Sequence, residues 1–481
     1  MHIILYVLDA LRADHLGCYG YQRNTSPNID FLSKNGVLFK HCSTSSTWTR
    51  PVAASLLSGT YPAIHQTRSR NDMFLTNLPR LPEALKLAGF KTAAFSTMGN
   101  IASEIGFDRG FDVFIDIFRD PAIIAKRRKL DAIKEGFIHN PDQEIALPRA
   151  EDVNDYLFPW IETHRDENTF SFIWSIEPHV PYAAPSEFRR FSFATQKKIN
   201  EGERDDIRGA GKKDRRRLLN LYDDEIYYND YCIGEIIKHL EVLGIFDDTL
   251  FVIISDHGEA FFEHHAYTHG HAPYEEVIQV PLIIKFPDSK FAGKIVSGLV
   301  ELIDLFPTLV SYVGVNYSEI VPNFLQGYNL MKIINGNKSQ VRDYTYTDTR
   351  ALDIHNQYYS VSDLNWKYIR ILSPNRTRKT VIKTINHIIN SRMIIDILSK
   401  PRHFFRNYLG VSSEQLYDLR SDPKELENKI VECKDVAIRM REVLSNWEEQ
   451  NKKISAKVEK FSGEFDEDEI IKQHLEKLGY L

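Results

Sequence analysis

The sequence of 481 residues predicts an α/β protein with a mostly parallel sheet and a smaller second unit. The first 120 residues alternate strand-like and helix-like segments. The apolar runs 3–8 and 249–254 are almost continuously hydrophobic, as in strands buried on both faces. The chain is also long enough for one large α/β domain and a smaller one.

The other helices and strands are predicted from the spacing of apolar residues, from helix-capping residues and from the turn residues that flank each segment. In chain order we predict a helix over 81–87, a strand over 91–96, a helix over 153–164, a strand over 170–176, a helix over 222–243, short strands at 358–361 and 366–371, and a helix over 435–453. The charged, glycine-containing stretch 187–217 is predicted to be an inserted loop or lid.

Carboxylates and an imidazole follow the two apolar strands directly. Asp9 ends the first strand, and Asp256 and His257 follow the second. Ligands of open α/β sheets bind beyond the carboxyl ends of the strands, so these side chains are expected to meet there. The combination suits a divalent metal ion. Each residue alone would also suit an Asx turn or a helix cap.

A hydroxyl residue precedes a helix start. Thr49 stands before Arg50 and Pro51 and a run of small, helix-compatible residues that ends at Gly59. Proline is tolerated in a first turn, and a helix N-terminus presents free N–H groups and a positive dipole to an anion. Thr49 is therefore a candidate nucleophile for a phosphate or sulfate ester. The alternative is an ordinary N-cap threonine.

The order and spacing of these motifs resemble the sulfatase branch of the alkaline phosphatase superfamily. The matching stretches are 9–20, 49–59, 178–182, 255–259, 269–270, 274–276, 280–284, 304–309, 416–423 and 478–481. The resemblance implies an alkaline phosphatase-like fold, with a large mixed, mostly parallel sheet flanked by helices and a smaller C-terminal α+β subdomain on a short antiparallel sheet. We accordingly predict a catalytic domain over 1–340, a C-terminal subdomain with a basic helical insert over 341–440, and a charged helical tail over 441–481.

The resemblance also implies a function, namely a metal-dependent hydrolase that cleaves sulfate or phosphate esters through a covalent intermediate on Thr49. The implied metal ligands are Asp9, Asp256, His257 and Thr49. His179 and His269 match positions that contact the transferred group or the leaving side. Asn100 and Arg50 are further candidates for substrate binding.

Two departures from the family pattern limit how much of the family's chemistry can be assigned to this chain. Formylglycine sulfatases begin from cysteine or serine and carry an arginine where this chain has Ala53, so Thr49 is expected to stay unmodified, without formylglycine. Many sulfatases have an aspartate pair where this chain has Asp9 and Ala10, and an asparagine at the position of His257. The present set resembles the phosphonate and phosphodiester hydrolase subset, and its imidazole favours one manganese or zinc ion over calcium or magnesium.

Two alternative functions stay open at this point. The first is a transferase that passes a phosphoryl-type group to a glycan or lipid alcohol, although such relatives usually carry membrane anchors. The second is a binding protein with a decayed site, which the joint presence of Thr49, Asp9, Asp256 and His257 disfavours.

Composition narrows the choice of partners. The net charge of −6 predicts no nucleic-acid binding, so the expected partner is a small anionic ester or a sulfated or phosphorylated glycan. The basic stretch 367–406 suits peripheral contact with an anionic surface, or a solvated helix packed on the core. Neither a signal peptide nor an apolar run of membrane-spanning length is found, which predicts a cytoplasmic protein. The sequence does not indicate an oligomeric state.

Overall fold

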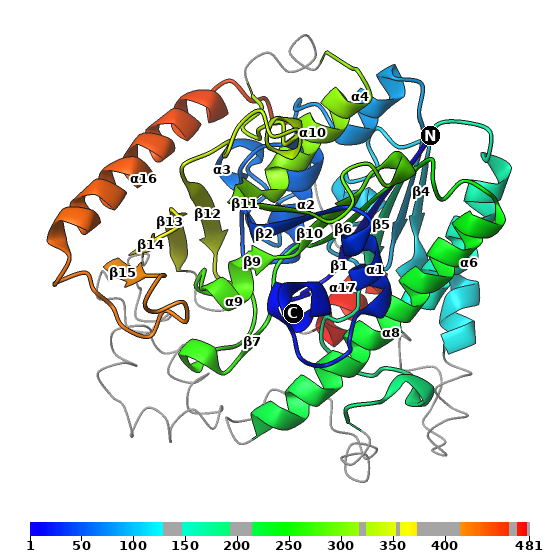
Figure 1. Cartoon of the computed structure of the whole chain (residues 1–481), viewed down its shortest axis with the longest axis horizontal. Coiled ribbons are helices and arrows are strands. Elements are labelled where there is room, and N and C mark those ends of the chain that lie inside the picture. Colours follow the sequence, from blue (N-terminus) through cyan, green and yellow to red (C-terminus); the bar gives the residue numbers. More distant parts are fainter. Residues whose placement is uncertain are drawn as a thin grey trace.

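The computed structural model describes residues 1–127, 147–192, 214–316, 324–352, 356–372, 414–460 and 469–478. A large sheet runs through the centre of the molecule in the strand order β11-β2-β10-β6-β1-β5-β3-β4, and β9 pairs with β2 (Figure 1). Its strands are β1 (His2–Leu8), β2 (Val37–Ser43), β3 (Lys91–Ser96), β4 (Val113–Asp116), β5 (Thr169–Ser175), β6 (Thr249–Ser255), β9 (Gln279–Val280), β10 (Leu282–Lys285) and β11 (Lys294–Glu301).

The sheet is mixed but mostly parallel. Strand β10 is antiparallel to both β2 and β6, and β9 is antiparallel to β2. The neighbours β6, β1, β5, β3 and β4 all pair in parallel. The predicted fold class is thereby confirmed, and the parallel block carries its carboxyl ends along one edge.

Both faces of the sheet are buried because alternate residues of each strand enter different cores. On β1, Ile3, Leu5 and Val7 face one core, whereas Ile4 and Tyr6 face the other. The helices of the first core are α2 (Thr49–Ser58), α4 (Leu81–Leu87), α10 (Leu305–Tyr312), α12 (Met331–Ile334) and α17 (Glu469–Lys477). The helices of the second are α1 (Pro27–Lys34), α6 (Ala150–Thr163) and α8 (Arg215–Val242). This double cover explains why the predicted strands lack polar alternation.

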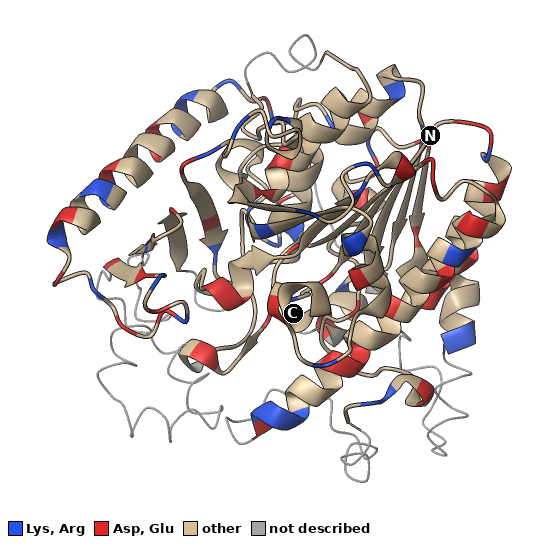
Figure 2. Cartoon of the chain, viewed as in Figure 1, with Lys and Arg blue, Asp and Glu red and all other residues tan. Residues whose placement is uncertain are grey.

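A second, antiparallel sheet forms the smaller C-terminal part, as expected. Its strands β12 (Thr345–Arg350), β13 (Gln357–Ser362), β14 (Trp366–Leu372) and β15 (Glu414–Asp418) pair in sequential order. Helix α16 (Lys434–Ser455) packs Met440, Leu444 and Trp447 against this sheet and against Tyr61, the residue that precedes α3 (Pro62–His65). Its outer side carries interspersed charges of both signs (Figure 2). The short elements β7 (Ala260–Phe261), β8 (Tyr267–Thr268) and α9 (Glu275–Ile278) lie between β6 and β9 in the chain, and β7 and β8 pair with each other.

Two predicted segments need correction. The lid predicted over 187–217 ends earlier, because Arg215 already begins α8, whose apolar side enters the second core. Residues 193–213 of the predicted lid lie outside the described part. Lys367, the first residue of the predicted basic surface, is fully buried in β14 and pairs with Glu275 and Glu425. It therefore faces no anionic surface, and residues 373–406 of that stretch lie outside the described part.

The predicted boundaries at residues 340 and 440 stay predictions, and α16 runs through the second of them without a break. In the described part of the chain, no helix combines the length and the apolar character needed to cross a bilayer.

Candidate active site

The side chains of interest gather where the parallel strands end. Leu8, the last residue of β1, pairs with Ser255 of β6 and with Ser175 of β5, so the three strands end at the same level. The residues that follow, Asp9 and Asp256, are therefore neighbours. The N–H of Ala10 donates to Asp256 Oδ1 although 246 positions separate these two residues in the sequence. This is the edge at which open α/β sheets bind ligands.

Asp9, Asp256 and His257 form a buried cluster at this edge. Their ligand atoms all lie within 4.8 Å of one another, and all three side chains are completely buried. His257 Nε2 lies 3.2 Å from Asp256 Oδ2 and 3.7 Å from Asp9 Oδ1. The structure thus brings together the three residues that the sequence nominated as metal ligands.

Backbone contacts fix the orientation of this cluster. Asp256 Oδ1 accepts hydrogen bonds from the N–H groups of Ala10 (3.0 Å) and His257 (2.8 Å). His257 Nδ1 lies 2.9 Å from the carbonyl oxygen of Gly258, and because a carbonyl only accepts, Nδ1 carries the proton. His257 Nε2 therefore faces the two carboxylates, the orientation that a metal ligand requires.

The turn after β1 holds a residue in the left-handed region. Ala10 has φ 63°, which costs a residue with a Cβ about 1–2 kcal/mol. Three contacts offset that cost: its N–H donates to Asp256, its carbonyl accepts from Tyr222 (2.7 Å), and its side chain is buried. The strained turn aims Asp9 back into the edge of the sheet.

Thr49 approaches the same cluster from helix α2. Trp48, with φ −160° and ψ 162°, occupies the N-cap position, so Thr49 is the first helical residue rather than the cap. Its Oγ1 lies 3.4 Å from Asp9 Oδ2 and 3.4 Å from His257 Nε2. Pro51 fits the first turn because the N–H groups there have no acceptor inside the helix. The hydroxyl therefore points into the carboxylate cluster, and the N-cap alternative does not describe it.

The cluster has the features of a cation site. Asp9 Oδ1 and Asp256 Oδ2 are buried and have no hydrogen-bond partner. Burial and the neighbouring Asp256 carboxylate raise the pKa of Asp9 well above its usual value, and burial also raises the pKa of Asp256. No lysine or arginine of the described part of the chain pairs with either acid, so two buried acids that share one imidazole fit a divalent metal ion, which would supply positive charge.

The two predicted catalytic histidines lie beside the cluster. The His269 ring centroid is 4.2 Å from that of His257, and the His179 centroid is 4.8 Å from that of His269. His269 Nδ1 is 3.0 Å from Glu259 Oε1. Burial lowers the pKa of His179 to about 3 and, with the neighbouring imidazoles, lowers the pKa of His269 well below its ordinary value. In this arrangement both rings are neutral near pH 7.

Arg50 and Asn100, the two predicted substrate-binding residues, contact each other. Arg50 Nη2 donates to Asn100 Oδ1 at 3.2 Å, and both side chains are fully buried. Because a guanidinium only donates, the Asn100 oxygen must face Arg50 and its Nδ2 must face elsewhere. That Nδ2 is buried and has no hydrogen-bond partner.

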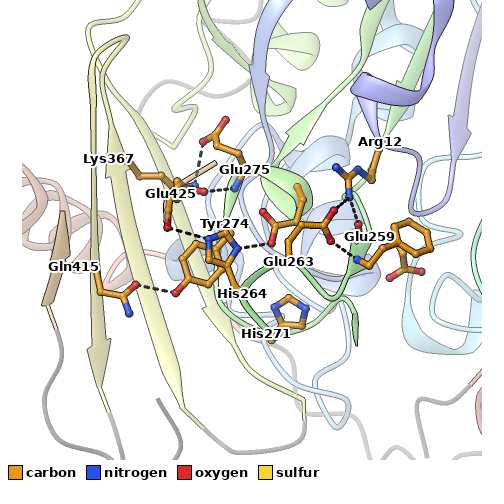
Figure 3. Close-up of polar contacts among 12 residues, drawn as sticks. Arg12, Glu259, Glu263, His264, His271, Tyr274, Glu275, Lys367, Gln415 and Glu425 are labelled. Atoms are coloured by element: carbon orange, nitrogen blue, oxygen red, sulfur yellow. Dashed lines mark hydrogen bonds and ion pairs between the residues drawn. The ribbon is translucent and has the colours of Figure 1, made fainter. Parts of the chain in front are cut away.

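His264 and His271, in the loop after β6, take part in packing. His264 Nδ1 is 2.8 Å from Glu276 Oε1, its Nε2 is 3.0 Å from the carbonyl oxygen of Glu425, and its ring stacks on Tyr274. Figure 3 shows this layer, in which His264 and Lys367 connect the loop to the small sheet. His271 Nε2 is 2.9 Å from the carbonyl oxygen of Thr268. These contacts support packing roles for His264 and His271.

Three residues at the site were not nominated from the sequence. Trp174 Nε1 donates to Asp9 Oδ2 at 2.9 Å, Glu259 holds His269, and His474 of α17 lies close enough to His179 to influence its pKa. Glu259 lies in the stretch 255–259 and could have been found from its position two residues after His257. Neither Trp174 nor His474 carries a local signal of this kind.

Comparison with known proteins agrees with the fold. A family model described as Sulfatase matches residues 1–315, and one described as N-sulphoglucosamine sulphohydrolase, C-terminal, matches 263–379. An N-acetylglucosamine-6-O-sulfatase of Bacteroides thetaiotaomicron is 22% identical over 94% of this chain and 86% of that protein. The iduronate 2-sulfatase of Homo sapiens is 22% identical over 89% of this chain and 90% of that protein.

Among solved structures, the phosphonate monoester hydrolase of Agrobacterium radiobacter superimposes with a TM-score of 0.68 at 18% identity, covering 94% of this chain and 96% of that chain. This likeness shows the shared fold. The family model covers more than half of the chain, from the first strand through α10. The chain therefore belongs to the sulfatase family of ester-bond hydrolases.

Proposed function

We propose that this protein cleaves sulfate or phosphate esters by attack of the Thr49 hydroxyl, with one divalent metal ion held by Asp9, Asp256, His257 and Thr49. The observation that carries the proposal is the position of Thr49 Oγ1, 3.4 Å from both Asp9 Oδ2 and His257 Nε2 at the carboxyl edge of the sheet. A nucleophile within reach of two basic groups is the arrangement that covalent catalysis requires.

The metal, when bound, lowers the pKa of a coordinated hydroxyl and neutralises charge on the ester. The donor set of two carboxylates and one imidazole favours manganese or zinc, with calcium or magnesium less well matched. Asp256 and His257 are held by backbone groups, so their ligand atoms need little reorganisation to accept an ion.

The chain's own residues perform the group transfer. The Thr49 oxygen forms a bond to sulfur or phosphorus, its proton passes to a neighbouring base, and the bond to the alcohol oxygen breaks. The alcohol oxygen leaves with a proton from water, beside the neutral rings of His179 and His269. Water then attacks the threonine ester, which releases the inorganic anion and restores the hydroxyl. The N-terminal N–H groups of α2 face the same place and stabilise the negative charge.

A sugar is the proposed alcohol portion of the substrate. The relatives reported above are named for sulfated amino-sugar and uronic-acid residues. The buried Nδ2 of Asn100 is an unused donor beside the site, which suits a hydroxyl-bearing ligand. The sulfate or phosphate character of the ester is left to experiment, since the two anions have similar size and shape.

The test measures the anion released from paired esters. Purified protein is stripped of metal and then loaded with Mn²⁺ or Zn²⁺, and sulfate or phosphate release is followed with 4-nitrophenyl sulfate, 4-nitrophenyl phosphate and bis-4-nitrophenyl phosphate. We expect release that requires metal and disappears in Thr49→Ala. Metal-bound protein that releases anion from none of these esters, nor from glucosamine 6-sulfate or glucose 6-phosphate, would contradict the proposal.

The mass of the peptide that contains residue 49 tests the nature of the nucleophile. We expect the peptide that contains Thr49 to have the mass of unmodified threonine, because the residue cannot be converted to the aldehyde that cysteine or serine gives. A modified Thr49 peptide would instead indicate a different nucleophile.

A further inference from the structure

The indole of Trp174 lies against one of the proposed metal ligands. Trp174 is the residue before the last one of β5, and it pairs with Val7 of β1, two positions before Asp9. Its side chain is fully buried in the same core as Val7. Its Nε1 donates a hydrogen bond of 2.9 Å to Asp9 Oδ2. Because an indole nitrogen only donates, the Asp9 oxygen is the acceptor.

This hydrogen bond gives the two oxygens of Asp9 different surroundings. Oδ2 accepts from Trp174 and lies 3.4 Å from Thr49 Oγ1. Oδ1 is buried, has no hydrogen-bond partner among the described residues, and lies 3.7 Å from His257 Nε2. The torsion that turns a carboxylate about its Cβ–Cγ bond is soft, so a donor on one oxygen decides which oxygen faces the cluster. Here Oδ1 is the oxygen left for an ion.

Asp9 is held differently from the other two members of the cluster. Asp256 and His257 are oriented by backbone N–H and carbonyl groups. In the described part of the chain, the Asp9 carboxylate accepts hydrogen bonds from side chains alone, those of Trp174 and Thr49. The Thr49 hydroxyl gives up its proton in the proposed reaction. Trp174 is therefore the donor that can hold Asp9 throughout.

We infer that Trp174 is a positioning residue, whose N–H holds Asp9 so that Oδ1 faces a divalent cation bound by Asp9, Asp256 and His257. The inference rests on the proposed function, because that function places the ion there. Trp174 acts through Asp9 and touches neither the ester nor the nucleophile. Outer partners of metal ligands commonly change metal affinity by about ten- to hundredfold, so the effect belongs on the Kd of the ion.

The test measures metal affinity and so does not depend on turnover. Protein stripped of metal is titrated with Mn²⁺, and the free ion is followed by electron paramagnetic resonance to give the Kd. Trp174→Phe keeps an aromatic ring in the core and removes the N–H donor. We expect this variant to raise the Kd by about tenfold, the lower end of the range for outer partners of metal ligands.

Trp174→His separates the hydrogen bond from the packing. An imidazole overlays the five-membered ring of an indole, so its Nε2–H can donate from nearly the position of the indole N–H. This variant loses more buried volume than Trp174→Phe, yet it should bring the Kd to within about threefold of wild type. If packing controlled the affinity, Trp174→His would instead bind Mn²⁺ more weakly than Trp174→Phe.

Trp48→Phe is the matched control. Trp48 is also fully buried in the same core, but its Nε1 has no hydrogen-bond partner among the described residues. The same substitution there removes packing without a hydrogen bond. The Kd should change by less than about threefold, while the thermal midpoint of the metal-free protein falls. An equal rise of Kd in Trp48→Phe and Trp174→Phe, or a Trp174→His variant no better than Trp174→Phe, would overturn the inference.

Binding and turnover of the wild type separate this inference from the proposed function. If Trp174→Phe binds Mn²⁺ as tightly as the wild type, the inference is wrong, whereas ester cleavage that requires metal and Thr49 would still support the proposed function. A weaker Kd in Trp174→Phe supports the inference even if the wild type cleaves no ester. Wild-type protein that binds neither Mn²⁺ nor Zn²⁺ would overturn both.

Discussion

Two buried clusters of charged residues differ in whether a cationic side chain of the protein balances the carboxylates. In the cluster between the two sheets, Arg342 pairs with both Glu301 and Asp304, so the cation is part of the chain. In the cluster at the sheet edge, Asp9 and Asp256 share one imidazole and each has an oxygen without a hydrogen-bond partner. Because unpaired buried charge is costly, only the second cluster has a physical reason to bind an ion from solution.

The two clusters also differ in how many of their carboxylate oxygens accept hydrogen bonds. Glu301 accepts from Tyr61 Oη at 2.5 Å and from the N–H of Tyr346 at 2.7 Å, and Asp304 Oδ1 accepts from the N–H of Tyr328. Every carboxylate oxygen of Glu301 and Asp304 accepts a hydrogen bond, whereas Arg342 Nε has no partner among the described residues, so these two carboxylates have no free oxygen for a metal ion. The comparison indicates that burial alone does not identify a cation site, whereas adjacent buried carboxylates with unpartnered oxygens favour one.

The largest expected effect is at the nucleophile. Thr49→Ala removes the attacking oxygen and should reduce ester cleavage by about a thousandfold or more. Metal content, measured by elemental analysis, should persist because Asp9, Asp256 and His257 remain. Thr49→Ser is the matched control and should keep measurable turnover. Turnover of the alanine variant within about tenfold of wild type would mean that another group attacks.

The second effect is on stability and concerns the cluster that carries its own cation. Arg342→Met leaves two buried carboxylates without a partner and should lower the free energy of unfolding by about 3–5 kcal/mol, measured from the denaturation midpoint. Arg441→Met is the control. It breaks a partly exposed pair with Glu414 and should cost less than about 1 kcal/mol. Equal losses of stability in the two variants would contradict the expectation that the buried carboxylates depend on Arg342 more than Glu414 depends on Arg441.

The third effect concerns the cluster that lacks a cation. Metal at about a hundred times its Kd should stabilise the wild type by about 2.7 kcal/mol, seen as a higher thermal midpoint. Asp256→Asn keeps the oxygen that accepts from Ala10 and His257 but removes the ligand charge, so most of this rise should vanish. Asp155→Asn, at a half-exposed position, should retain it. A metal-induced rise of equal size in Asp256→Asn would mean that the ion binds elsewhere.

The smallest effect is a change in pH dependence. Burial raises the pKa of Glu301 from 4.5 to about 7, even with Arg342 beside it. Between these values the folded state holds a proton that the unfolded chain has lost, so this group makes stability fall as pH rises from 4.5 to 7. Glu301→Gln should therefore flatten the dependence of the denaturation midpoint on pH across that window. An unchanged slope would show that Glu301 ionises at its ordinary pKa.

Much of the fold could be predicted because local patterns coincide with the elements. The helix predicted over 81–87 and the strand predicted over 91–96 match α4 and β3, and the strand predicted over 170–176 matches β5 to within one residue. The helix predicted from Tyr222 begins at Arg215 instead: Leu218 and Leu221 already enter the second core at helical spacing, but they follow three arginines that read as the end of the charged insert.

Part of the site could be predicted for a related reason. A polar residue at the end of a buried parallel strand must lie at one edge of the sheet, so Asp9, Asp256 and His257 were found from position alone. Lys367 and Trp174 could not be assigned in this way. Lys367 is in a basic stretch yet is enclosed by two glutamates from other segments, and Trp174 reaches Asp9 through the pairing of β5 with β1.

The sequence by itself determined the order of strands and helices, the residues at the strand ends and the hydroxyl at the start of α2, because these depend on neighbours a few positions away. Only the tertiary structure decided which charges are neutralised, how the imidazoles are arranged around Thr49, and that Trp174 donates to Asp9. Those outcomes depend on contacts between segments hundreds of residues apart, whose energies no local pattern records.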